Sequence, residues 1–120
     1  MTEQKENQIK KITEKLLEFR KARDWEQFHN PKDLAASLTL EAAEVLEHFQ
    51  WKSESEIKEY IASHREELSE ELADVFNWIL LMSHDLGIDI IEASKRKIEI
   101  NDKKYPVEKS KGRHTKYTDL

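Results

Sequence analysis

Helix-breaking residues are scarce in this chain, and their scarcity limits what it can fold into. Only two glycines and two prolines occur among its 120 residues. Glycine and proline are the strongest punctuation between elements of secondary structure. The good helix formers Glu, Lys, Leu and Ala are abundant instead. The sequence therefore predicts an all-α fold and argues against a β-sheet.

The positions of these few breakers, with the spacing of apolar residues, divide the chain into helical segments. Asn30-Pro31 is a strong helix start, because asparagine can cap a helix and proline suits the first helical position. Gly87 suits the C-terminal end of a helix, and Asp89 can cap the next one. We expect helices over about residues 3–22, 31–51, 53–63, 64–86 and 90–104, the third of them short.

The last part of the chain differs from the rest in charge. Residues 1–92 carry 11 Lys and Arg against 21 Asp and Glu, whereas residues 93–120 carry 9 against 4. Pro106 is expected to end the last helix. We therefore predict an all-α domain over residues 1–104, followed by an extended basic C-terminal tail over residues 105–120.

Composition also limits the partners of the chain. The net charge is −5 and the body of the chain is acidic, which argues against nucleic-acid binding because that needs a basic face. The hydrophobic fraction of 38% is low for a lone globular monomer. We expect the four long predicted helices to form a four-helix bundle with the one extra short helix. Burial of a helix face against another copy would make up for the low hydrophobic fraction, so we expect this bundle to assemble into a homodimer or homotetramer.

The cysteine content and the lengths of the apolar stretches indicate where in the cell the protein could be located. The chain has no cysteine, which excludes disulfides and thiolate metal sites. No stretch approaches the roughly 20 apolar residues of a membrane span. The first residues lack the apolar core of a signal peptide. We expect no membrane association and a cytoplasmic location.

Two pairs of acidic residues share the three-residue spacing that places side chains on one face of a helix. They are Glu41 with Glu44, and Glu71 with Asp74. Two such helices packed antiparallel would bring four carboxylates together, and hard oxygen ligands of this kind suit Mg²⁺ or Mn²⁺. The spacing by itself is weak evidence, because other pairs in this Glu-rich chain share it and such pairs are mostly solvated helix surface.

Position on the helix separates these pairs from the others. Glu41 projects within the apolar stripe of its predicted helix, with Glu44 beside it, and Glu71 flanks the stripe of the long helix. A carboxylate at a core-facing position is costly unless it is paired or bound to a metal. Buried salt bridges are the alternative interpretation, but the sequence offers few basic partners near these stripes.

Two tryptophans follow the acidic pairs at equal distance. Trp51 lies seven residues after Glu44, and Trp78 lies seven after Glu71. Seven residues make nearly two turns, so each indole shares a helix face with its carboxylate. Indole rings beside a metal–phosphate site could stack on a nucleobase. Packing in the core or in an oligomer interface is the other interpretation, and it is commoner for tryptophan.

From about residue 16 to the C-terminus the chain resembles the MazG-like all-α nucleotide pyrophosphohydrolases, and within them the dCTP pyrophosphatase group. The metal signature of that family is E-x-x-E, a spacer and E-x-x-D. It corresponds here to Glu41–Glu44, 26 residues, and Glu71–Asp74. The other resembling segments are residues 23–29, 49–52 and 116–120, with Lys97, Asn101 and the Tyr105-Pro106 step.

The resemblance implies hydrolysis of a nucleoside triphosphate between its α and β phosphates, giving the monophosphate and pyrophosphate. Mg²⁺, or Mn²⁺, would be held by Glu41, Glu44, Glu71 and Asp74. Glu41 or Glu44 would orient or deprotonate the attacking water. The preferred substrate would be dCTP or a modified dCTP, in a role of nucleotide-pool sanitation.

The resemblance also implies the residues that contact the rest of the substrate. Phosphate and sugar would meet Lys97, Asn101, Lys104 and Tyr105, and the base would meet Trp25, His29, Trp51 and Trp78. The dCTP group is expected to have tyrosine where this chain has Trp78, which keeps dUTP or a broad range of non-standard triphosphates as an alternative. A helical interaction module with structural carboxylates, which would not be an enzyme, is the second alternative.

Overall fold

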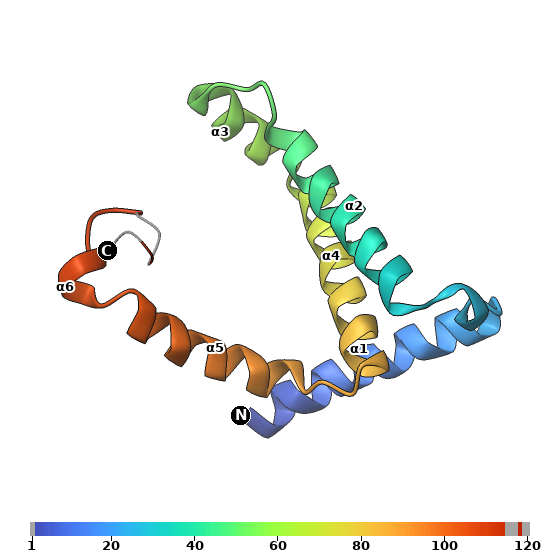
Figure 1. The fold of residues 1–120 in the computed structure, drawn as a ribbon. Coiled ribbons are helices and arrows are strands. Elements are labelled where there is room, and N and C mark those ends of the chain that lie inside the picture. The colour runs from blue at the N-terminus through green and yellow to red at the C-terminus, as the bar shows by residue number, and fades with distance from the viewer. Residues whose placement is uncertain (1, 115–117, 119–120) are drawn as a thin grey trace. The chain divides into compact units, whose positions relative to one another are not determined.

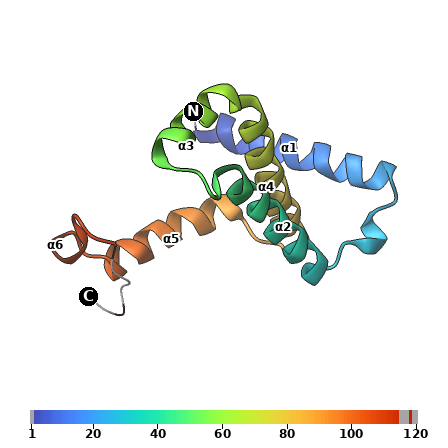
Figure 2. The same cartoon turned by 90° about the horizontal axis from the view of Figure 1, so that it is seen from above.

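Helices α2 (Pro31–Phe49) and α4 (Arg65–Asp85) run side by side and antiparallel in the computed structural model, joined through the short helix α3 (Glu54–Ser63) (Figures 1 and 2). Helix α1 (Thr2–Ala22) also packs against α4. The structure describes residues 2–114 and 118. It divides into two units, residues 1–87 and 88–120, and these four helices belong to the first. The predicted all-α fold class is confirmed.

Local signals in the sequence set the ends of these helices. The Asn30 side chain accepts a hydrogen bond of 2.9 Å from the backbone N–H of Asp33, and Pro31 takes the first helical position. Ser53 and Glu56 form a capping box at the start of α3. Gly87 follows α4 with a φ of +67°, a left-handed conformation that glycine adopts without steric cost. The predicted helices are therefore found within a few residues of their expected ends.

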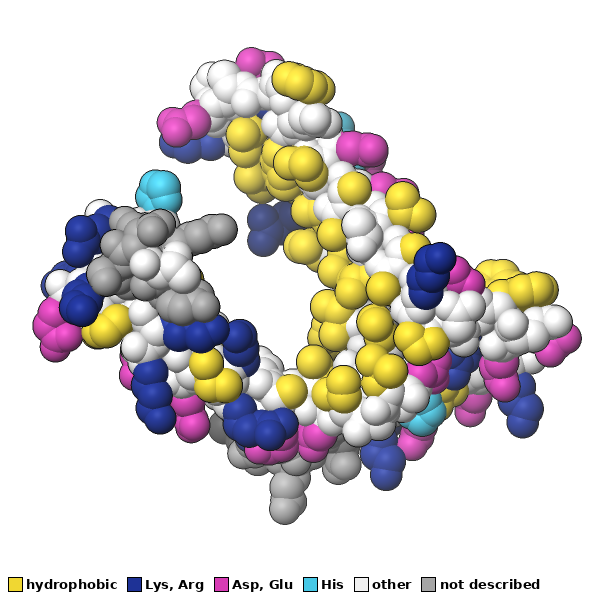
Figure 3. All heavy atoms as spheres, viewed as in Figure 1, with side chains coloured by type: hydrophobic (Ala, Val, Ile, Leu, Met, Phe, Trp, Pro, Cys, Tyr) yellow, Lys and Arg dark blue, Asp and Glu magenta, His cyan; other side chains and the backbone are white. Residues whose placement is uncertain are grey.

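The core of the first unit lies between α2 and α4 and is small. Leu34 on α2 and Leu80 and Leu81 on α4 are its fully buried hydrophobic side chains among the described residues. Other large apolar side chains on these helices stay exposed, including Leu46 at 59% and Leu72 at 58%. Figure 3 shows hydrophobic side chains gathered along one face of these helices. None of the described helices is long and apolar enough to cross a membrane.

The second unit contains helix α5 (Ile90–Lys104) and the single-turn helix α6 (Val107–Ser110). The Asp89 side chain caps α5 by accepting a hydrogen bond of 3.1 Å from the backbone N–H of Glu92, as predicted. The prediction of an extended chain after residue 104 is wrong at residues 107–110. Pro106 ends α5, but its φ of −57° suits the start of a new helical turn. The division into a domain over 1–104 and a tail over 105–120 stays a prediction.

Candidate metal site and neighbouring aromatic pocket

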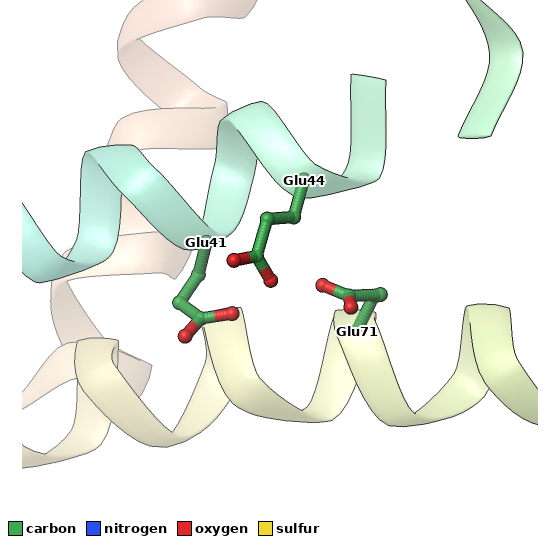
Figure 4. Close-up of side chains that lie close together, drawn as sticks. All are labelled: Glu41, Glu44 and Glu71. Atoms are coloured by element: carbon green, nitrogen blue, oxygen red, sulfur yellow. The ribbon is translucent and has the colours of Figure 1, made fainter. Parts of the chain in front are cut away.

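Three of the four predicted carboxylates converge between α2 and α4. Glu41 and Glu44 project from α2, and Glu71 projects from α4 toward them (Figure 4). One carboxylate oxygen of each residue lies within 4.8 Å of those of the other two. We call these three residues the acidic cluster. The antiparallel pairing of two helices, each with its own acidic pair, brings them together.

Asp74, the fourth predicted carboxylate, lies one turn after Glu71 on α4. It is exposed and lines an adjacent aromatic pocket. Its negative charge nevertheless contributes to the raised pKa of both Glu41 and Glu71. Asp74 therefore stands at the edge of the acidic cluster, between that cluster and the pocket.

The acidic cluster gathers negative charges that the described residues compensate only in part, since the attraction of His48 lowers the pKa of Glu71 by less than the other causes raise it. Partial burial, hydrogen bonding to Glu44 and repulsion by the other carboxylates raise the pKa of Glu41. Hydrogen bonding to Glu44, then partial burial and repulsion by Glu44, raise the pKa of Glu71. The Oε2 atoms of Glu41 and Glu71 are buried and accept no hydrogen bond from any described residue. Such atoms are costly unless a proton or a cation neutralises them.

The donor set of the acidic cluster fits a hard divalent cation. Its ligands are carboxylate oxygens from two rigid helices, the ligand type that Mg²⁺ and Mn²⁺ prefer in proteins. The alternative interpretation from the sequence was a set of buried salt bridges. The two unpartnered Oε2 atoms favour a cation over that alternative.

An aromatic pocket of about 350 Å³ lies beside the acidic cluster, and Asp74 is part of its lining. Trp25 and His29 reach it from either end of the short 3₁₀ helix η1 (Glu26–Phe28), and Trp78 reaches it from α4. The His29 and Trp78 rings meet edge to face, with centroids 5.5 Å apart. The complete lining is Leu16, Phe19, Arg20, Trp25, His29, Asp74, Asn77, Trp78 and Leu81.

Three of the four residues predicted to bind the base therefore share one pocket. Trp51, the fourth, does not line it. Its side chain is 92% exposed, and its φ of +69° places it in a left-handed turn between α2 and α3. A role of Trp51 in base binding stays a prediction.

The residues predicted to bind phosphate and sugar belong to the second unit. Lys97 and Asn101 lie one turn apart on α5, so they share a helix face. Lys104 ends α5 and Tyr105 follows it. Their part in substrate binding stays a prediction. Residues 116 and 117 and residues 119 and 120 of the resembling C-terminal motif lie outside the described residues.

Two features at these sites escaped prediction. Arg20, which lines the aromatic pocket, forms a two-pronged ion pair with Asp85 at 2.8 and 3.0 Å. Arg20 lies four residues after Leu16, so it stands on the apolar stripe of α1, and a charge there is a signal of a buried ion pair.

The second feature is a polar cleft of about 420 Å³ on another side of the acidic cluster. It is lined by Glu44, Glu47, His48, Tyr60 and Glu71. The Nδ1 atom of His48 hydrogen-bonds the Tyr60 hydroxyl, which ties α2 to α3. The spacing of His48, four residues after Glu44, was the signal that it shares the helix face of the acidic cluster.

The fold and the site together define an all-α protein with a carboxylate cluster beside an aromatic pocket. The MazG-like family matches residues 36–120, and the chain belongs to that family. It is similar to dCTP pyrophosphatase 1 of Mus musculus, with 40% identity over 105 residues, and to that of Homo sapiens, with 38% identity. Each of these alignments covers 86% of this chain but 62% of the relative, so the chain spans less than two thirds of these curated relatives.

A solved structure supports the same fold. The crystal structure of a pyrophosphatase from Archaeoglobus fulgidus DSM 4304 superimposes with a TM-score of 0.78 and 42% sequence identity. The alignment covers 82% of this chain and 93% of that one. The arrangement of helices around the acidic cluster is therefore shared with a protein of known structure.

Proposed function

We propose that this protein is a metal-dependent nucleoside triphosphate pyrophosphohydrolase that converts a dNTP into the dNMP and pyrophosphate. The observation that carries the proposal is the acidic cluster of Glu41, Glu44 and Glu71, with two unpartnered buried oxygens, next to an aromatic pocket. This pairing suits a substrate with a charged phosphate chain at one end and a flat base at the other. The similarity to proteins named dCTP pyrophosphatase supports dCTP or a modified dCTP as the preferred substrate.

The four carboxylates Glu41, Glu44, Glu71 and Asp74 would hold Mg²⁺, with Mn²⁺ as a substitute of similar chemistry. When bound, the metal supplies positive charge that offsets the negative charge of the triphosphate and of the leaving pyrophosphate. The helices hold the carboxylates in place before substrate arrives, so little reorganisation is needed at the moment of reaction.

The remaining steps belong to the side chains of the chain itself. Glu41 or Glu44 orients a water molecule and accepts one of its protons as the water oxygen bonds to phosphorus. The bond between the α phosphorus and the oxygen that bridges the α and β phosphates breaks in the same reaction, and pyrophosphate leaves with that oxygen. Trp25, His29 and Trp78 hold the base by stacking and edge contacts. Lys97, Asn101, Lys104 and Tyr105 are proposed to contact the phosphates and the sugar.

The protein is further proposed to act as a homodimer or homotetramer in the cytoplasm. Large exposed apolar side chains support an assembly, among them Leu72 on α4 and Ile98 on α5, which is 66% exposed. Light scattering coupled to size-exclusion chromatography would measure the mass. A monomer at micromolar concentration would contradict this part of the proposal.

A screen of standard and modified dNTPs with Mg²⁺, scored by pyrophosphate release, tests the activity. The Glu71→Gln variant is expected to lose turnover, whereas Glu70→Gln, at the neighbouring exposed position of α4, is expected to keep it. A protein that hydrolyses no dNTP and binds no Mg²⁺ would instead be a helical interaction module. Preference for dUTP or turnover of many non-standard triphosphates would support the alternative raised by Trp78, whose indole has no hydroxyl.

A further inference from the structure

Arg20 is the most buried charged residue among those described, with 8% of its surface exposed, and it lines the aromatic pocket. Its Nη1 atom donates to Asp85 Oδ2 at 2.8 Å, and its Nη2 atom donates to Asp85 Oδ1 at 3.0 Å. These paired bonds fix the plane of the guanidinium. The side chain is therefore held rigidly in the wall of the pocket.

Asp85 uses only part of the hydrogen-bonding capacity of Arg20. A guanidinium has five N–H donors and no acceptor. The Nε atom of Arg20 is buried and has no hydrogen-bond partner in the described part of the chain. A buried donor of this kind is costly until something accepts from it. Nε–H and the outer N–H of Nη2 together form a second, parallel pair of donors on one side of the guanidinium.

His29 extends this set of donors. Its Nδ1 atom lies 3.5 Å from Nη1 of Arg20, at the long limit of a hydrogen bond. Because arginine can only donate, Nδ1 is the acceptor in this contact, and the Nε2 atom of a neutral His29 then carries the proton. The imidazole ring, in turn, stands edge to face against Trp78. Arg20 thus also orients one of the rings that line the pocket.

A pocket rich in donors selects bases by their acceptors. Cytosine presents O2 and N3 side by side as two acceptors, and guanine pairs with them through a guanidine-like edge of two N–H groups. The Nε–H and Nη2–H edge of Arg20 is the same chemical unit. Because its Nε atom is buried, a base that accepts from this edge would have to enter deeply enough to reach a donor that solvent does not reach. Uracil and thymine carry N3–H at that place, which would set a donor against a donor. A site built to hydrogen-bond one group discriminates strongly against an analogue that cannot form the bond.

We infer that Arg20, anchored by Asp85, determines base selection in the aromatic pocket, favouring cytosine over uracil and thymine. The inference rests on the proposed function, because it takes the pocket to be the base site of a dNTP pyrophosphohydrolase. It assigns specificity to Arg20 and not to the stacking rings, which accept any base. Asp85 is a positioning residue, since it acts through Arg20.

Binding of dCMP and dUMP, measured by titration calorimetry, tests the inference without requiring turnover. The unmodified protein is expected to bind dCMP roughly tenfold to hundredfold more tightly than dUMP, the discrimination of one paired hydrogen-bond contact. Arg20→Lys keeps the charge but loses the planar pair of donors, so the preference is expected to fall to near one. Lys21→Gln, at the exposed neighbouring position, is the matched control and is expected to keep the preference.

If the ion pair is merely structural, Arg20→Lys should weaken the binding of both nucleotides alike and leave the ratio of their affinities unchanged. No preference in the unmodified protein, or a preference that survives Arg20→Lys, overturns the inference. If Arg20→Lys does not fold by circular dichroism, Asp85→Asn replaces it. That variant keeps every donor but loosens the anchor, and an unchanged ratio in it overturns the inference equally.

The ratio of kcat/KM for dCTP and dUTP separates the two proposals. Turnover by the unmodified protein without base preference rejects the role of Arg20 and keeps the pyrophosphohydrolase function. Base-selective binding of dCMP without turnover of any dNTP keeps the role of Arg20 and rejects that function.

Discussion

Two groups of charged side chains lie along α4, and they satisfy their charges in opposite ways. The acidic cluster gathers Glu41, Glu44 and Glu71 with no cation among the partners of its buried oxygens, and the pKa of Glu41 and of Glu71 is raised. At the far end of the helix, hydrogen bonding to Arg20 lowers the pKa of Asp85. The same chemical group, a carboxylate, is destabilised in its charged form in one place and stabilised in the other.

The difference teaches which group binds something from outside. The carboxylate of Asp85 is paired with a positive charge of the same chain, and it serves to hold Arg20 in place. The carboxylates of the acidic cluster are not neutralised until a cation or a proton binds to them. Placing these carboxylates close together lowers the stability of the fold, as is common at functional sites. Substitutions in the two groups should therefore change stability with opposite signs.

The largest expected effect is on activity, at the acidic cluster. Glu41→Gln should lower kcat/KM for the preferred dNTP by about a thousandfold, because it removes a metal ligand and a candidate base. The same variant should melt a few degrees higher than the unmodified protein in EDTA, since one repelling charge is gone. Turnover and differential scanning calorimetry measure the two effects. Unchanged turnover, with helical content intact, would make Glu41 a structural residue.

Asp85→Asn should show the opposite sign of stability change. Losing the partner of a largely buried arginine is expected to cost about 2 kcal/mol, between the values of exposed and fully buried pairs. The melting temperature should fall by about 10 °C for a unit of this size. Because the pKa of Asp85 is lowered, the difference should shrink as the pH falls below 3.8, the ordinary value for an aspartate. A variant as stable as the unmodified protein would show that the pair contributes nothing.

The aromatic pocket should lose base affinity when its ring on α4 is removed. Trp78→Ala should raise KM for dCTP about tenfold and change kcat less, because stacking binds ground and transition states alike. Trp51→Ala is the informative comparison, since Trp51 does not line that pocket. Steady-state kinetics measure both variants. An equal rise in KM for Trp51→Ala would place Trp51 at the base as well.

The smallest expected effect is the pH dependence of the acidic cluster without metal. The folded-state pKa of Glu41 and of Glu71 lies above the ordinary value of 4.5, so the folded state holds protons that the unfolded state has lost. Stability should therefore fall as the pH rises from about 4.5 through the raised values. In EDTA, the advantage of Glu41→Gln in melting temperature should grow over that range, and Mg²⁺ should reverse it. An advantage independent of pH would show that Glu41 is not neutralised in the fold.

The features that the sequence predicted correctly all depend on residues that lie within about one helical turn of each other. Glu41 and Glu44 are three residues apart, so a helix alone puts them on one face. The caps at Asn30 and Ser53 likewise act on backbone groups within one turn. The error after Pro106 has the same origin, since proline both ends one helix and suits the start of another, and the local pattern did not decide between them.

By itself, the sequence determined an all-α chain with acidic pairs on two helices, because helix formation and side-chain periodicity are local. Tertiary structure decided which pairs meet. Only the antiparallel packing of α2 and α4 brings Glu71 to Glu41 and Glu44 and leaves Asp74 at the edge of the pocket. Only the packing of α1 on α4 joins Arg20 to Asp85, which lie 65 positions apart. Contacts over such separations depend on how whole helices pack, which no spacing within one helix encodes.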